Sequence, residues 1–135
     1  MEHNNRMCYP EGAIGVAQVG EKEWMFEYPR LNWEVLEEFH DAIEHWRMGD
    51  AAFAEEAYRQ MIDDYPEFID AHHHLALLLS QTGRGEQAFR IWQDVVAMGL
   101  DCLPKEFEMG RGLLFWSILE NRPFLRAYHS FGLEY

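Results

Sequence analysis

The chain has 135 residues, of which 15% are aromatic, so it is long enough for one domain with an apolar core and too aromatic for a disordered protein. Its 24 acidic residues outnumber its 11 lysines and arginines and give a net charge of −13, which argues against nucleic acid as a partner. The same charge favours basic peptides or proteins, although an acidic surface that only keeps the protein soluble explains it equally well.

Residues 1–32 are interrupted by glycines and prolines and predict an N-terminal arm. Within it, residues 13–19 and 24–28 read as two strands joined by a turn, and we expect this hairpin to pack on the first helix. The alternative is an irregular arm that is held in place by its aromatic side chains.

Apolar residues at helical spacing predict four helices, at residues 32–48, 51–65, 68–82 and 86–98. Asn32 is a good N-cap for the first, and Pro66 stops the second. Gly83 is expected just beyond the third helix, and Gly99 is expected to end the fourth. Residues 100–121 are less regular, and Pro123 then opens a fifth helix at a position where its missing N–H does no harm.

Matched side chains recur along these helices at a period of about 34 residues, which is typical of repeat proteins. The matched pairs are Gly49 and Gly83, Ala42 and Ala76, Ala54 and Ala88, and Tyr58 and Trp92.

This pattern resembles the tetratricopeptide repeat (TPR) family, in which each repeat is a pair of antiparallel helices. The resemblance implies an all-α solenoid over residues 33–135, following the arm at 1–32. Its parts would be a first repeat at 33–66, a second at 68–99, an irregular segment at 100–121 and a partial third repeat at 122–135. Residues 119–127 also resemble a segment found in bacterial repeat proteins.

The resemblance implies that the first helix of each repeat lines a concave groove that binds a protein or peptide. The alternative is that this surface is simply a solvated helix face. His40, His73 and His129 fall at equivalent positions of the three repeats. The expected groove residues are Glu37, His40, Glu44, Arg47, Asp70, His73, Leu77, Ser80, Gln81, Arg126, His129 and Leu133.

The last helix carries an apolar face with no second helix after it in the sequence. Tyr128, Phe131 and Tyr135 are expected on this oligomer or capping face. Exposed apolar surface costs about 25 cal/mol per Å2, so an uncovered face needs an explanation. Three explanations stay open. The chain is a fragment, the face folds back on residues 100–118, or a second copy covers it in a homodimer. The last of these makes structural homo-oligomerisation the alternative function.

The cysteines and the lack of targeting segments indicate the compartment. Cys8 and Cys102 form no CxxC pair, so we expect a reducing compartment, with a bridge between the two as the alternative. The first residues lack the apolar stretch of a signal peptide, and the longest apolar run, 75–79, is too short to span a bilayer. The sequence therefore predicts a cytoplasmic protein without a membrane partner.

No residue pattern indicates catalysis or a cofactor, and no metal-binding motif supports the alternative that the groove histidines hold an ion together with Glu37, Glu44 or Asp70. The consecutive histidines 72–74 diverge by about 100° each on a helix and cannot converge on one ion. Asn121 is expected to cap the last helix, and Arg122 and Arg126 to pair with nearby acids. The acid pairs 55–56 and 63–64 are expected to be exposed, and the tryptophans at 33, 46, 92 and 116 to lie in the core. The sequence predicts a non-catalytic binding scaffold.

Overall fold

The computed structural model describes residues 11–104, 114 and 118–134, without the side chains of the last two. In this part of the chain, five α-helices follow a two-stranded hairpin, which confirms the all-α fold class. The elements are β1 (Gly15–Gln18), β2 (Trp24–Glu27), α1 (Trp33–Arg47), α2 (Ala51–Asp64), α3 (Ile69–Gln81), α4 (Gly85–Cys102), the short 3-10 helix η1 (Leu119–Asn121) and α5 (Arg122–Glu134).

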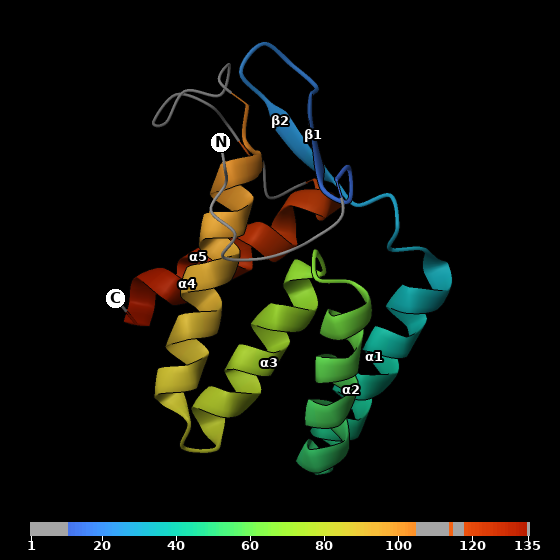
Figure 1. Ribbon diagram of the computed structural model, residues 1–135, viewed down its shortest axis with the longest axis vertical. Helices are drawn as coiled ribbons and strands as arrows, with labels where there is room; N and C mark the ends of the chain where they lie inside the picture. Colours follow the sequence, from blue (N-terminus) through green and yellow to red (C-terminus); the bar gives the residue numbers. More distant parts are fainter. Residues whose placement is uncertain (1–10, 105–113, 115–117, 135) are drawn as a thin grey trace.

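The helices pack in pairs along the chain (Figure 1). α1 lies antiparallel to α2, and α3 lies antiparallel to α4, with α2 and α3 in contact between the two pairs. α5 packs across α3 and α4, and the hairpin lies at the end of the molecule near the start of α5. α3 is thus enclosed by its neighbours, and eight of its 13 residues are buried.

Local signals in the sequence set both ends of α1 and the start of α2. The Asn32 side chain accepts a hydrogen bond of 3.0 Å from the Val35 N–H, which confirms the predicted N-cap of α1. Asp50 caps α2 in the same way, accepting from the Phe53 N–H at 3.2 Å. The turn after α1 contains Gly49 with a φ of +94°, a conformation that glycine adopts without strain.

The end predicted for the fourth helix is wrong. α4 continues through Gly99 to Cys102, and Gly99 is buried inside the helix. A Cβ at this position would collide with the Phe124 ring of α5. The glycine therefore lets two helices approach each other closely, and it does not act as a C-terminal signal.

The predicted hairpin is present, with Gly15 opposite Glu27 in an antiparallel register. The hairpin was expected to pack on the first helix, but its strongest contacts are with η1 and α5. The Asn121 side chain accepts a hydrogen bond from the Phe26 N–H at 2.9 Å and donates one to the Trp24 carbonyl at 3.0 Å. The Phe26 ring lies 5.1 Å from that of Phe124. Asn121 thus occupies the place of a third strand beside β2, a role that the sequence did not predict.

Glu67 anchors the loop before α1 to the turn before α3. Its side chain is fully buried and receives two hydrogen bonds, of 2.8 and 2.9 Å, from the Arg30 guanidinium. Arg30 also lies over the Tyr65 ring at 5.2 Å. Because a buried carboxylate without a partner is strongly unfavourable, this pair fixes the position of the loop.

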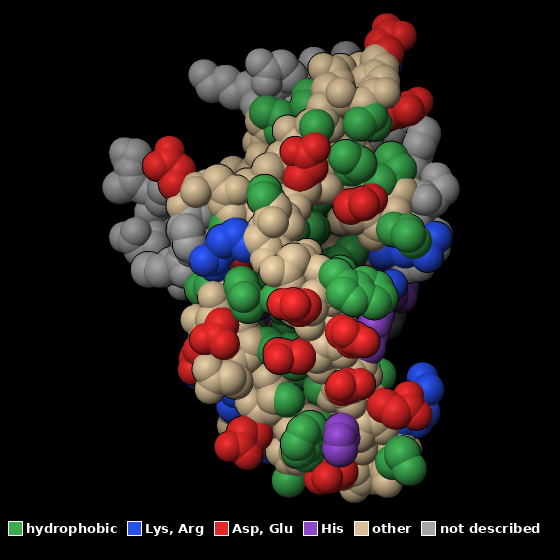
Figure 2. Space-filling view, turned by 90° about the vertical axis from the view of Figure 1, so that its right-hand side faces the viewer, with side chains coloured by type: hydrophobic (Ala, Val, Ile, Leu, Met, Phe, Trp, Pro, Cys, Tyr) green, Lys and Arg blue, Asp and Glu red, His purple; other side chains and the backbone are tan. Residues whose placement is uncertain are grey.

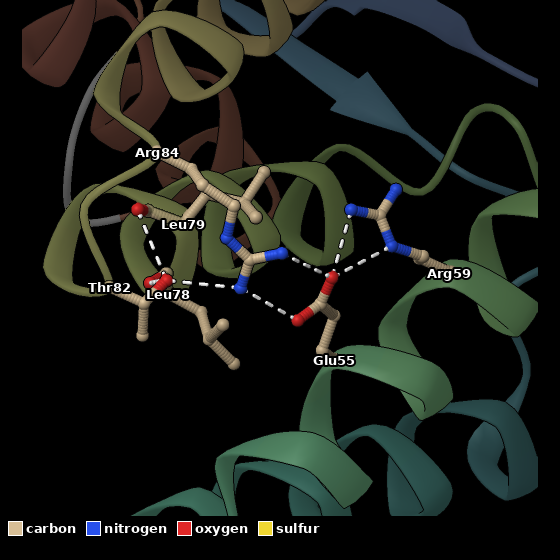
Figure 3. Close-up of polar contacts among 6 residues, drawn as sticks. All are labelled: Glu55, Arg59, Leu78, Leu79, Thr82 and Arg84. Atoms are coloured by element: carbon tan, nitrogen blue, oxygen red, sulfur yellow. Dashed lines mark hydrogen bonds and ion pairs between the residues drawn. The ribbon is translucent and has the colours of Figure 1, made fainter.

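Glu55 connects the first helix pair to the second (Figure 3). It was expected to be exposed, but it is half-buried and receives hydrogen bonds of 2.9 and 3.0 Å from Arg84, in the turn between α3 and α4. Arg59, one turn along α2, also donates to it. The hydrogen bonds from Arg84 hold the pKa of Glu55 below its usual value. This contact sets the spacing between α2 and that turn.

Asn121→Ala is expected to lower the free energy of unfolding by about 2–4 kcal/mol, because it leaves the buried Phe26 N–H and Trp24 carbonyl without partners. Urea unfolding followed by circular dichroism measures the loss. Glu120→Ala, at the exposed neighbouring position, is the matched control and should change stability by less than about 0.5 kcal/mol. Equal losses in the two variants would contradict the role given to Asn121.

Gly99→Ala is expected to destabilise the protein by about 1–3 kcal/mol, because the new methyl group overlaps the Phe124 ring. Gly132 is the matched helical control, since a Cβ there meets no atom within 4 Å. Gly132→Ala should therefore stabilise α5 by up to about 1 kcal/mol. Thermal unfolding of both variants tests the difference, and a change of the same sign in both would contradict it.

Candidate functional site

A cleft of about 680 Å3 opens where α1, α3 and the start of α5 meet the hairpin. These three helices are the ones that the sequence assigned to the groove, and we call the surface they form the α1–α3–α5 face. Hydrophobic side chains make up most of the lining. The lining residues are Met25, Glu27, Tyr28, Pro29, Leu31, Leu36, Phe68, Ile69, Asp70, Leu119, Glu120 and Pro123.

Asp70 is the half-buried carboxylate of the cleft, and it is engaged inside the protein. Arg126 of α5 donates to both of its carboxylate oxygens, at 3.1 and 3.2 Å, and His74 lies 3.5 Å from one of them. Burial on its own would raise the pKa of Asp70, but the hydrogen bond from His74 and the charge of Arg126 lower it below its usual value. Asp70 therefore stays ionised and ties α5 to α3.

Two tyrosine hydroxyls near Asp70 are buried. Neither Tyr28 nor Tyr58 makes a hydrogen bond through its hydroxyl within the described residues. Burial, with a smaller effect of the Asp70 charge, raises the pKa of Tyr58 to about 12, and burial also raises the pKa of Tyr28. Both stay protonated at neutral pH. Two tyrosine hydroxyls that stay protonated suit a binding surface better than they suit acid–base catalysis.

The predicted row of groove histidines is interrupted at its centre. His40 and His129 are exposed, but His73 is buried and accepts a hydrogen bond of 3.0 Å from the Trp92 indole N–H. The neighbouring His72 is also buried and donates to the Pro66 carbonyl at 2.9 Å. The expectation that His73 lines an open groove is wrong, because α3 is enclosed by α4 and α5 on the side where His73 lies.

The other expected groove residues differ in exposure. Asp70, Leu77 and Arg126 are half-buried, and Asp70 and Arg126 are brought into contact. The side chain of Leu133 lies outside the described residues. The exposed members are Glu37, His40, Glu44, Arg47, Ser80, Gln81 and His129. The structure brings Glu44 and Arg47 together in an ion pair of 3.2 Å on α1. Whether these residues contact a partner stays a prediction.

The solvent face of α1 combines carboxylates with hydrophobic side chains. Trp33 was expected in the core, but it is 74% exposed, and Leu36 at the edge of the cleft is 36% exposed. Figure 2 shows acidic side chains gathered over this part of the molecule, with hydrophobic ones between them. The exposed acids of α1 are Glu34, Glu37, Glu38, Asp41 and Glu44.

Sequence reasoning missed Trp33 and Leu36 as surface residues. A helical-spacing signal was available, because Trp33 lies four residues before Glu37 and therefore shares its face of the helix. The aromatic character of Trp33 favoured the core instead.

Most of the apolar face of α5 is covered within the chain. Phe124 and Ala127 are buried, and the Phe131 ring stacks on Phe89 of α4 at 5.4 Å. Tyr128 is 41% exposed, and Tyr135 lies outside the described residues. Residues 100–118, on which the face would fold back in one of the three explanations, lie largely outside the described residues. Cys8 of the alternative disulfide lies outside them as well.

Among the described residues, no group of three or more histidine, cysteine, aspartate or glutamate side chains is placed to hold a metal ion. A search of the same residues for a helix long and apolar enough to cross a membrane finds none.

Comparison with known proteins gives one weak structural likeness. No family model matches the chain, and no curated protein matches it. The chain is similar to the crystal structure of a tetratricopeptide repeat domain protein from Salinibacter ruber, with 17% identity and a TM-score of 0.46, over 70% of this chain and 94% of that one. The resemblance of residues 119–127 to a segment of bacterial repeat proteins stays a prediction.

Stability is expected to fall as the pH drops from about 6.5 toward 4, because burial lowers the pKa of both His72 and His73 to about 4. The unfolded chain binds protons below pH 6.5 while the folded protein does not. Each histidine therefore contributes a slope of up to about 1.4 kcal/mol per pH unit in this window. Urea unfolding at a series of pH values measures it.

His73→Gln keeps an acceptor for Trp92 and should remove about half of the slope. His40→Gln, at an exposed position, is the control and should leave the slope unchanged. A wild-type stability that does not change between pH 5 and 6.5 would contradict the assignment of neutral, buried histidines.

Proposed function

We propose that this protein is a non-catalytic scaffold that binds another polypeptide on its α1–α3–α5 face, with the cleft as the centre of the contact. The observation that carries the proposal is the cleft itself, which is lined mainly by hydrophobic residues and is continuous with exposed Leu36 on α1. Its volume of about 680 Å3 falls within the range of about 300–1,000 Å3 that is usual for binding pockets.

The rigidity of the surroundings supports the proposal. The walls of the cleft come from separate elements that are joined by polar contacts, including the buried contact of Asn121 with β2 and the half-buried contact of Arg126 with Asp70. A surface that is already ordered loses little conformational entropy when a partner binds.

The ionisable groups of the cleft favour binding over chemistry. Asp70 is engaged by Arg126, and Glu27 and Glu120 are exposed to solvent. A general acid or base needs a pKa that has been moved toward neutrality, and the pKa of Asp70 is moved away from it.

Homo-oligomerisation through the last helix has less support. Phe131 of that face already packs against α4 of the same chain, and Phe124 in the first turn of the helix packs against β2. Tyr128 is the exposed aromatic residue of the described part of α5, and one such side chain is ordinary for a protein surface.

Peptides selected on this protein from a random display library are expected to bind the α1–α3–α5 face. Amide chemical-shift changes should concentrate on Leu36, Phe68 and Leu119 in a titration followed by NMR. Gln60 on α2 and Gln93 on α4, both exposed, are the internal controls and should not shift. Shifts that concentrate on α2 and α4, or a library that yields no binders, would overturn the proposed function.

A further inference from the structure

We infer that the occupant of the cleft is a polypeptide segment that places one large hydrophobic side chain in the cleft and lays lysine or arginine residues along the solvent face of α1. The inference rests on the proposed function and names the chemistry of the partner.

The hydrophobic half of the segment is indicated by the walls of the cleft. Leu36 and Leu119 stand at its exposed edge, with exposed fractions of 36% and 64%, while Phe68 and Ile69 lie buried deeper. An apolar side chain that enters removes this surface from water together with its own. A wholly polar segment would leave it exposed.

The basic half is indicated by the charges that surround the cleft. Among the described residues, its lining contains three carboxylates, those of Glu27, Asp70 and Glu120, and no lysine or arginine. Asp70 is neutralised by Arg126, but Glu27 and Glu120 are exposed. An acidic segment would be repelled at this position, and a basic one would be attracted.

The solvent face of α1 extends the same charge away from the cleft. Five exposed carboxylates lie between Glu34 and Glu44. The arginine of the helix, Arg47, pairs with Glu44 at its far end, but both side chains are more than half exposed, so this ion pair is weak and leaves Glu44 open to a partner. Trp33 is 74% exposed in the first turn of the same helix. A guanidinium or ammonium group can lie on an exposed indole ring while it pairs with a neighbouring carboxylate.

The helix geometry sets the spacing of the basic residues. Glu37 follows Leu36 directly, and Glu44 lies seven residues further on, which is about 10 Å along the helix axis. An extended peptide advances about 3.3 Å per residue. The favoured segment is therefore a hydrophobic residue, a basic residue next to it, and a second basic residue about three positions later.

The test uses a fluorescein-labelled peptide with the core Phe-Lys-Ala-Ala-Lys and glycine–serine flanks. Two comparison peptides replace the phenylalanine by serine or both lysines by glutamate. Fluorescence anisotropy should show that losing the phenylalanine weakens binding about tenfold or more. The glutamate peptide should not bind, and raising the salt from about 50 to 500 mM should weaken the lysine peptide several-fold.

The double variant Glu37→Gln with Glu44→Gln should weaken the lysine peptide by about two- to thirtyfold, because two exposed ion pairs are lost. The control is Glu86→Gln with Asp101→Asn, which removes the same charge from exposed positions of α4 and should leave the affinity unchanged. All four residues are exposed, so both variants are expected to fold, and circular dichroism verifies it.

Three results would overturn the inference. The serine peptide binds as well as the phenylalanine peptide, the affinity does not depend on salt, or both double variants weaken binding equally. The last result would mean that the peptide is held by the net charge alone. If library peptides bind the α1–α3–α5 face without basic residues, the inference fails while the proposed function stands. If they bind elsewhere, the proposed function fails first.

Discussion

α3 lies against α2 and α4, α5 crosses it, and the ring of Phe68 just before it packs on Phe39 of α1 at 4.9 Å. Few positions on this helix face water, so its polar side chains must find partners inside the protein. His73 meets Trp92, and Asp70 meets Arg126. These contacts fix α4 and α5 relative to α3, and the arrangement of the whole α1–α3–α5 face depends on them.

The cleft exists because the hairpin is held at the end of this stack. A two-stranded hairpin is marginal in isolation, and here Asn121 satisfies the backbone of β2 from a position 95 residues later in the chain. Arg30 and the buried Glu67 hold the segment that leads from the hairpin into α1. Polar contacts therefore hold the loop walls of the cleft in place, which suits the proposed binding without large rearrangement.

In the proposed complex, two neighbouring surfaces contact the partner in different ways. The cleft offers hydrophobic area, and the solvent face of α1 offers carboxylates beside the exposed Trp33. Hydrophobic burial supplies affinity without direction, while charge supplies orientation and excludes acidic partners. In this proposal, the acidic side chains on α1, which contribute to the net charge of −13, form part of the binding surface.

The sequence alone determined the helices, the hairpin and most of their ends, because helical periodicity, the cap at Asn32 and the turn at Gly49 are set by residues close together in the chain. Only the tertiary structure decided the rest. Gly99 reads locally as a helix end, but Phe124 of α5 makes it a site of close packing. Trp33 was expected in the core and is exposed, whereas His73 was expected in an open groove and is buried. Burial depends on which neighbours the fold brings to a helix face. The cleft could not be predicted for the same reason, since its walls come from segments that meet only after folding.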